Sequence, residues 1–370
     1  MKNNQSNSNK KSVAKFLCAL MKDIKKQYKN IGIITDKDGT VVLNNDLTQT
    51  LLDMKKKLKN NMWIILNSGR TVGDMLETLK KENIPSACFD YIIGDNGGIA
   101  IRVKDHEQLF KNTMKSEKVQ EVIDEFLKNG GTPQNIRLTN GYNIIVYKNR
   151  KVKRYYKQGK NVIFTRHIVR VKEEDITKLT LTGSKEQISR MVDYINKNLK
   201  EYETHEGKTS FPEAESNNYR VDCTGKNDKG QAMNYMIKKL SLDRCIVLGN
   251  DLNDLSMFKV ALKRGDHIVI AGNEQPEITK QLVGELKRYC QSEKISWTES
   301  NILVLEEQNV NQFLRKILII MKIVKDKQND RKDFINKLKY KEENKRVKSL
   351  LNKHNTKSKN KKGKMQFYRG

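Results

Sequence analysis

Short apolar runs rich in β-branched residues recur along this chain, and the first two each end in a polar loop. These two lie at 30–35 and 62–66, and the segment 47–58 between them carries apolar side chains at helical spacing. Further runs lie at 245–248, 267–270 and 302–305. Strands that alternate with helices predict right-handed βαβ crossovers and an α/β fold, with a parallel sheet covered by helices on both faces. Ligands bind such sheets beyond the carboxyl ends of the strands.

Residues from about 99 to 211 interrupt this alternation. Antiparallel hairpins are predicted at 92–101, which turns at an NGG segment, and at 136–147, which turns at an NG segment. A strand is expected at 179–182 and a helix at 187–199. This pattern predicts an α+β insert within the α/β body, placed as a cap over the edge of the sheet where ligands bind.

The chain of 370 residues carries a formal net charge of +28, which is concentrated at its two ends. Residues 1–30 hold eight lysines and one aspartate, and residues 322–370 hold 18 Lys or Arg against five Asp or Glu. We therefore predict a basic N-terminal extension at 1–29 and a basic, partly helical or disordered tail at 322–370. Clustered lysines bind phosphates by counterion release, so the tail is either a solvated appendage or a weak contact with nucleic acid or an anionic surface.

The sequence also bears on the compartment. No apolar run is long enough to cross a bilayer, because the best one, Phe313 to Val324, contains three basic residues. A secretory signal is not expected, since the apolar stretch Val13 to Met21 is short and contains Lys15. The five cysteines lack CxxC spacing, which argues against disulfides and a zinc site and favours a reducing compartment. We expect a cytoplasmic protein without a membrane span.

Two carboxylates one residue apart, Asp36 and Asp38, follow the first predicted strand in the segment DKDGT. This arrangement suits Mg²⁺-assisted phosphoryl chemistry, in which Asp36 is the nucleophile and a metal ligand. Asp38 is then the acid that protonates the leaving oxygen and later activates water. A tight Asx turn or a calcium loop is the alternative interpretation of this segment alone.

Three further segments place polar groups at predicted strand ends or helix starts. After the second strand, Ser68, Gly69 and Arg70 form a candidate phosphate cradle, with an ordinary helix N-cap as the alternative. Lys229 begins a helix, where its ammonium either neutralises a phosphate or simply lies exposed. The segment 249–254 (GNDLND) crowds amide and carboxylate oxygens that suit Mg²⁺, although such clusters also cap helices.

The order of these segments resembles the four motifs of the haloacid dehalogenase (HAD) superfamily, in ITDKDGT, IILNSGR, NDKGQAM and LGNDLNDLSMF. Over roughly residues 30–285 the chain looks most like the Cof-type sugar phosphatases of class IIB. The likeness includes a DNG turn before the insert and an AGN segment near the end of that range. It implies a HAD-like, Rossmann-type parallel-sheet core at 30–98 and 212–310, with an inserted α+β cap of C2B type at 99–211.

The resemblance also implies roles for individual residues. The implied catalytic residues are Asp36, which forms an aspartyl-phosphate, and Asp38, the general acid and base. The implied phosphate-binding residues are Ser68, Gly69, Arg70 and Lys229. The implied Mg²⁺ ligands are Asp36, the Asp38 carbonyl, Asn250 and Asp254. The supporting residues are Thr40, Asn253 and Asn273.

The fourth motif departs from the usual GDxxND, because Asn250 occupies its first acidic position. An amide oxygen still ligates Mg²⁺ but carries no charge, so metal affinity should fall while Asp36 and Asp254 keep the site anionic. We expect a tolerated variant and an active enzyme. In the third motif, Lys226 is an alternative to Lys229.

Together these residues predict a Mg²⁺-dependent phosphomonoester hydrolase for a small phosphorylated metabolite, which the resemblance narrows to a sugar phosphate. Cap side chains that would select the substrate are weak candidates at Arg137, Asn140, Arg166 and His167. The alternatives are a HAD-like scaffold, or a phosphatase for nucleic-acid ends that the basic termini recruit.

Overall fold

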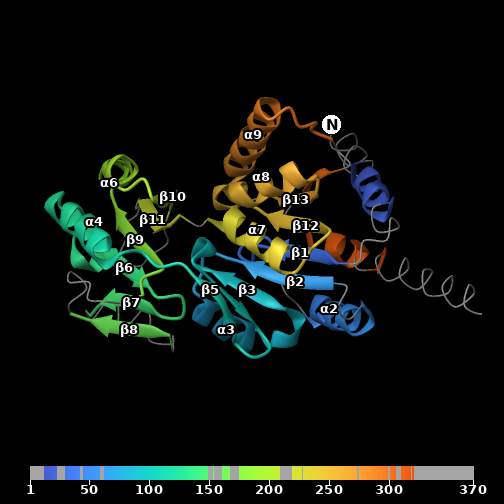
Figure 1. Cartoon of the computed structure of the whole chain (residues 1–370), viewed down its shortest axis with the longest axis horizontal. Coiled ribbons are helices and arrows are strands. Elements are labelled where there is room, and N and C mark those ends of the chain that lie inside the picture. The colour runs from blue at the N-terminus through green and yellow to red at the C-terminus, as the bar shows by residue number, and fades with distance from the viewer. Residues whose placement is uncertain are drawn as a thin grey trace, which may run out of the picture. The chain divides into compact units, whose positions relative to one another are not determined.

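In a computed structural model of the protein (Figure 1), the strands form two sheets, each with its own helices. The structure describes residues 12–22, 30–41, 45–58, 62–148, 153, 161–166, 175–208, 219–226, 228–272, 275–298, 301–305, 310–317 and 319–320.

The first sheet has eight strands among the described residues, in the order β14-β13-β12-β1-β2-β3-β4-β5. The strands are β1 (Ile31–Thr35), β2 (Met62–Asn67), β3 (Tyr91–Gly94), β4 (Ile99–Arg102), β5 (Gln108–Lys111), β12 (Arg244–Gly249), β13 (His267–Ala271) and β14 (Ile302–Leu305). From β14 to β3 every neighbouring pair is parallel, as predicted for an α/β fold. Thr35 lies beside Leu248 on one side and Leu66 on the other, so the carboxyl ends of β12, β1 and β2 are level.

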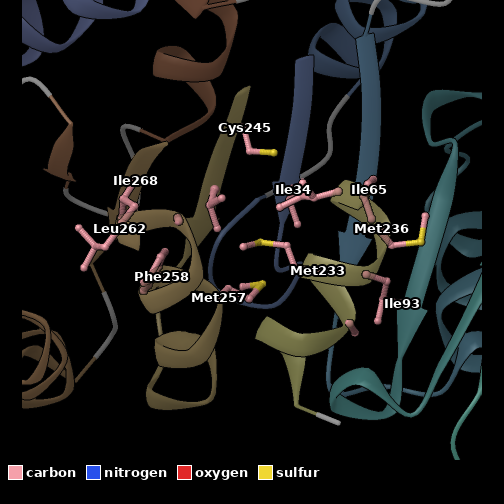
Figure 2. Packing of buried hydrophobic residues seen from close by; sticks show 14 of the residues in the cluster. Ile34, Ile65, Ile93, Met233, Met236, Cys245, Met257, Phe258, Leu262 and Ile268 are labelled. Carbon is pink, nitrogen blue, oxygen red and sulfur yellow. The ribbon is translucent and has the colours of Figure 1, made fainter. Parts of the chain in front are cut away.

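Helices cover both faces of this sheet. They are α2 (Asn45–Leu58), α3 (Val72–Lys81), α7 (Lys229–Lys239), α8 (Leu255–Arg264) and α9 (Pro276–Ser292). Figure 2 shows Met233 of α7 beside Ile34 and Met236 of the same helix beside Ile65, and the two isoleucines are partners on adjacent strands. The alternate residues Ile33 and Ile64 are equally buried on the other face, as expected for strands covered on both sides.

The second sheet has six strands among the described residues, in the order β10-β11-β9-β6-β7-β8. The strands are β6 (Ile136–Thr139), β7 (Ile144–Tyr147), β8 (Val162–Thr165), β9 (Lys178–Gly183), β10 (Tyr202–Lys208) and β11 (Tyr219–Gly225), and the helices are α4 (Ser116–Lys128) and α6 (Lys185–Asn198). Leu179 and Val221 belong to one apolar cluster with buried residues of α4 and α6, so the alternating residues Lys178 and Asp222 belong to the opposite, polar face. The predicted hairpin at 136–147, strand at 179–182 and helix at 187–199 are all present.

The ends of the insert differ from the predicted 99–211. β4 pairs with β3 and β5 pairs with β4, so residues 99–111 remain in the first sheet. β11, which was predicted to belong to the core, pairs with β9 and β10 in the second sheet. The insert therefore runs from α4 to β11, because backbone pairing continues through the hairpin at 91–102 before the chain leaves the first sheet. Residues 226–228 then connect β11 to α7.

Part of the predicted N-terminal extension is folded onto the body. Residues 12–22 form a helix in which Phe16 and Leu20 are buried. The Phe16 ring lies 5.1 Å from the ring of His267 in β13 and 5.5 Å from that of Phe313. The predicted tail at 322–370 lies outside the described residues. In the described part of the chain, no helix combines the length and apolar character needed to cross a membrane.

Candidate active site

Four of the predicted segments meet at one edge of the first sheet. Asp36 follows β1, Ser68 follows β2 and Asn250 follows β12, and these strands are neighbours in the order β12-β1-β2. The backbone N–H of Asp36 donates to the Leu248 carbonyl at 3.0 Å, which holds the first segment against the end of β12. Lys229 is the first residue of α7. The segments converge because parallel strands end at the same edge of a sheet.

The Lys229 ammonium lies between two carboxylates and is fully buried. Its Nζ donates to Oδ1 of Asp36 at 2.9 Å and to Oδ1 of Asp254 at 2.7 Å. Burial lowers the pKa of Lys229, but the two carboxylates outweigh burial and the pKa is raised. The Asn67 side-chain amide donates to the Lys229 carbonyl at 2.9 Å and ties the start of α7 to the end of β2. Lys226, the alternative in the third motif, is exposed.

The buried carboxyl of Asp36 is strongly perturbed. Burial raises the pKa of Asp36 to about 7. Lys229 acts in the opposite direction, whereas the negative charges of Asp254 and Asp38 raise the pKa further. Lys229 carries one positive charge against the two carboxylates that it contacts, which favours a bound cation.

The fourth segment is fixed by its own backbone and by the first segment. Oδ2 of Asp254 accepts hydrogen bonds from the N–H groups of Asn250 at 2.9 Å and of Asp251 at 3.1 Å. Oδ1 of Asn250 accepts from the Thr40 hydroxyl at 3.1 Å. Gly39 has a φ of +70°, and a Cβ there would lie 2.2 Å from Nδ2 of Asn250. Only glycine suits both this backbone conformation and the close approach of the two segments.

Asp38 and Arg70 form a two-point ion pair. Nε of Arg70 donates to Oδ2 of Asp38 at 2.6 Å, and Nη2 donates to Oδ1 at 2.8 Å. Nη1 of Arg70 also donates to Asp74 at 3.1 Å. The guanidinium thus holds the candidate acid and base in one orientation. The predicted contact of Arg70 with a phosphate stays a prediction.

The loop at 68–70 directs its carbonyls toward protein donors. The carbonyls of Ser68 and Arg70 accept from backbone N–H groups of the turn at 95–96, and the Gly69 carbonyl accepts from Nζ of Lys178 at 2.5 Å. The Arg70 N–H donates to Oγ of Ser68 at 3.2 Å. The Gly69 N–H makes no hydrogen bond to another described residue. The Ser68 hydroxyl proton and the Gly69 N–H are therefore suited to bind a phosphate oxygen.

Comparison with known proteins assigns this geometry to a family. The family model of haloacid dehalogenase-like hydrolases matches residues 33–282, more than half of the chain. The chain belongs to this family. The predicted resemblance to the HAD superfamily is thereby confirmed, and so is the prediction that the protein is a hydrolytic enzyme.

One related protein and several solved structures agree with this family assignment. The mannosylfructose-phosphate phosphatase of Agrobacterium fabrum is 26% identical over 248 residues, which are 66% of this chain and 84% of the relative. A HAD-like hydrolase of Bacteroides thetaiotaomicron has a TM-score of 0.56 at 17% identity, covering 80% of this chain and 100% of the other. A HAD/Cof-like hydrolase of Plasmodium vivax has a TM-score of 0.54 at 17% identity, covering 83% and 99%. A HAD subclass IIB sugar phosphatase has a TM-score of 0.50 at 17% identity, covering 72% and 100%. The solved structures confirm the HAD-like fold.

The oxygen donors of this HAD site fit Mg²⁺. They are the carboxylates of Asp36 and Asp254, the amide oxygen of Asn250 and the backbone carbonyl of Asp38. Mg²⁺ is commonly bound by one or two carboxylates, with waters and substrate phosphate oxygens completing its shell. No cluster of three or more His, Cys, Asp or Glu suited to a metal occurs among the described residues. An asparagine stands at position 250, and its amide oxygen is a neutral donor. As ligands these residues stay a prediction.

For the other predicted site residues the structure shows fewer contacts with the groups described above. Asn253 contacts Asn96, with 3.5 Å between its Nδ2 and the amide oxygen. Arg137 lies on β6, Asn140 accepts hydrogen bonds within the turn that follows β6, and Arg166 is exposed. Asn273 and His167 lie outside the described residues.

Two residues at this site, Asp95 and Lys178, were assigned no role from the sequence, although Asp95 belongs to the DNG turn noted there. Asp95 is completely buried and accepts from the hydroxyls of Thr177 at 2.6 Å and Thr139 at 2.9 Å. Nζ of Lys178 lies 3.6 Å from Oδ1 of Asp95. The signal for Lys178 was a lysine that begins a short strand of alternating leucine and threonine, where a buried charge must find partners in the fold.

Proposed function

We propose that this HAD-like hydrolase is a Mg²⁺-dependent phosphomonoester hydrolase that acts on a small sugar phosphate through an aspartyl-phosphate. The observation that carries this proposal is the buried Lys229 ammonium between Asp36 and Asp254, at the same sheet edge as Ser68. Phosphoryl transfer requires mainly positioning and charge stabilisation, which this arrangement supplies.

In the first half-reaction, a carboxylate oxygen of Asp36 attacks phosphorus as the bond from phosphorus to the leaving oxygen breaks. Asp38, protonated and released from its ion pair with Arg70, donates its proton to that oxygen, so the alcohol leaves neutral. Lys229 balances the Asp36 charge, and Ser68 with the Gly69 N–H binds the phosphate oxygens. When bound, Mg²⁺ adds positive charge beside the transferred group.

In the second half-reaction, water replaces the alcohol. Asp38, now a carboxylate, takes a proton from that water as its oxygen attacks phosphorus. The bond from phosphorus to Asp36 breaks, which releases inorganic phosphate and restores both aspartates. The ion pair with Arg70 keeps Asp38 oriented.

A sugar phosphate is supported by the Agrobacterium relative, whose name states a phosphatase for mannosylfructose phosphate. All five cysteines are free thiols, which fits the predicted cytoplasmic compartment. The scaffold alternative does not explain why a buried lysine and two buried carboxylates are kept together. The alternative of recruitment to nucleic acid depends mainly on the basic tail, outside the described residues.

The test measures phosphate release from an aryl phosphate and from a panel of sugar phosphates, with Mg²⁺ and with EDTA. We expect release only with Mg²⁺ and a higher kcat/KM for sugar phosphates than for a 5′-phosphorylated oligonucleotide. Asp36→Asn should abolish release, whereas the control Asp193→Asn, on the exposed side of α6, should leave it unchanged. Release that survives Asp36→Asn, or that does not need Mg²⁺, would contradict the proposal.

A further inference from the structure

Lys178 begins β9 in the second sheet, and its side chain reaches the phosphate loop of the first. The side chain is 4% exposed, although it carries an ammonium. Its Nζ donates to the Gly69 carbonyl at 2.5 Å. A buried ammonium that donates to a carbonyl makes a charge-assisted hydrogen bond, which is stronger than one between neutral groups.

The Gly69 carbonyl belongs to the same peptide group as the Arg70 N–H, and that N–H donates to Oγ of Ser68 at 3.2 Å. A peptide group is planar, so fixing its oxygen also fixes the direction of its N–H. The Arg70 N–H occupies a lone pair of Oγ, and the hydroxyl proton of Ser68 remains for another acceptor. A chain of polarised donors thus runs from Lys178 through one peptide group to the Ser68 hydroxyl.

We propose that Lys178 is a positioning residue that orients the Ser68 hydroxyl, through the Gly69–Arg70 peptide, toward the phosphate of the substrate. This inference rests on the proposed function. In this inference the insert contributes to phosphate binding, because the orienting ammonium belongs to Lys178 in β9 and the hydroxyl belongs to Ser68 in the loop after β2. Lys178 does not itself touch the reacting atoms.

Two carboxylates also face Lys178, and their effect must be separated from this task. Oδ1 of Asp95 lies 3.6 Å from Nζ. Burial raises the pKa of Asp222, but the charges of Lys178, Arg220 and Arg137 outweigh burial and hold it below its ordinary value. A purely structural lysine would act through these carboxylates, whereas a positioning lysine acts through Ser68.

A double-mutant cycle between Lys178→Met and Ser68→Ala distinguishes the two roles. The full-length chain is assayed for kcat and KM on an aryl phosphate with Mg²⁺, and for binding of inorganic phosphate by calorimetry. Loss of a charge-assisted hydrogen bond predicts that Lys178→Met lowers kcat/KM by roughly 10- to 100-fold. In the Ser68→Ala background the same substitution should lower it by less than about threefold. Lys178→Arg, which keeps a donor, should retain most of the activity, and Lys185→Met, at an exposed lysine of α6, should match the wild type.

Three results would overturn the inference. The first is that Lys178→Met lowers activity no more than Lys185→Met does. The second is that its loss in the Ser68→Ala background equals its loss in the wild type. The third is that Asp95→Asn reproduces the whole loss. If the wild type binds phosphate but hydrolyses none of the substrates, only the proposed function is refuted. The double-mutant cycle is then evaluated from the affinity of each variant for phosphate. A wild type that binds no phosphate would overturn both.

Discussion

Replacing Lys229 by methionine nearly keeps the length of the side chain but removes the charge between two buried carboxylates. Removing one partner of a buried ion pair destabilises a protein by about 3–5 kcal/mol, since the other charge is left uncompensated. Lys229 serves two carboxylates, at 2.9 Å and 2.7 Å, so we expect the upper part of this range. A loss of about 4–5 kcal/mol corresponds to a fall in Tm of roughly 5–6 °C for a chain of 370 residues, because the entropy of unfolding scales with chain length.

The assay is thermal unfolding in EDTA and again in excess Mg²⁺. Mg²⁺ should return part of the lost stability to Lys229→Met, because a cation then balances Asp36 and Asp254. The control is Lys238→Met, at an exposed position of the same helix, which should change the free energy of unfolding by no more than about 0.5 kcal/mol. If Lys229→Met loses no more stability than Lys238→Met, the reasoning about charge balance is wrong.

Three further predictions concern the surrounding residues. Arg70→Lys keeps the charge but loses the two-point contact with Asp38, so kcat for phosphate release should fall about tenfold; an unchanged kcat would show that this geometry is not needed. Gly39→Ala places a Cβ against Asn250 at a φ of +70°, and it should lower the free energy of unfolding by about 1–3 kcal/mol and raise the Mg²⁺ concentration required for activity. Denaturant unfolding and a Mg²⁺ titration check this, and wild-type values in both would contradict it. Burial lowers the pKa of His205 below its ordinary 6.5, so as the pH falls the unfolded chain takes up this proton before the folded chain does, and stability is lost. Between about pH 8 and about pH 5.5 the wild type should lose about 1 kcal/mol more than His205→Asn in denaturant unfolding, whereas equal losses would show that His205 is not the cause.

The parallel core was predictable because its signal is local. Each apolar run is followed by its polar loop, and the rule that parallel strands end at one edge brings Asp36, Ser68 and Asn250 together without further information. The pair Asp38–Arg70 was not predicted, because it depends on how two loops approach each other. Lys178 was missed for the same reason, since the partner of a buried lysine lies 109 residues away in the sequence.

The boundaries of the insert were wrong for a related physical reason. The composition of β11 suits a strand in either sheet, and only its backbone hydrogen bonds to β9 and β10 decide which sheet it joins. Such pairing joins residues distant in the sequence, and side-chain periodicity does not report it.

Because the connection between β11 and α7 is short, Lys229, which contacts Asp36, is the first helical residue after the insert. Gly225 and Lys229 are separated by four residue steps, so the chain between them spans at most about 14 Å when fully extended. A tilt of β11 that carries Gly225 beyond this reach must therefore displace Lys229, and with it the charge beside Asp36. Substitutions inside the insert that alter its tilt can thus change the rate of chemistry without contacting the substrate, and screens for altered specificity should measure kcat and KM separately.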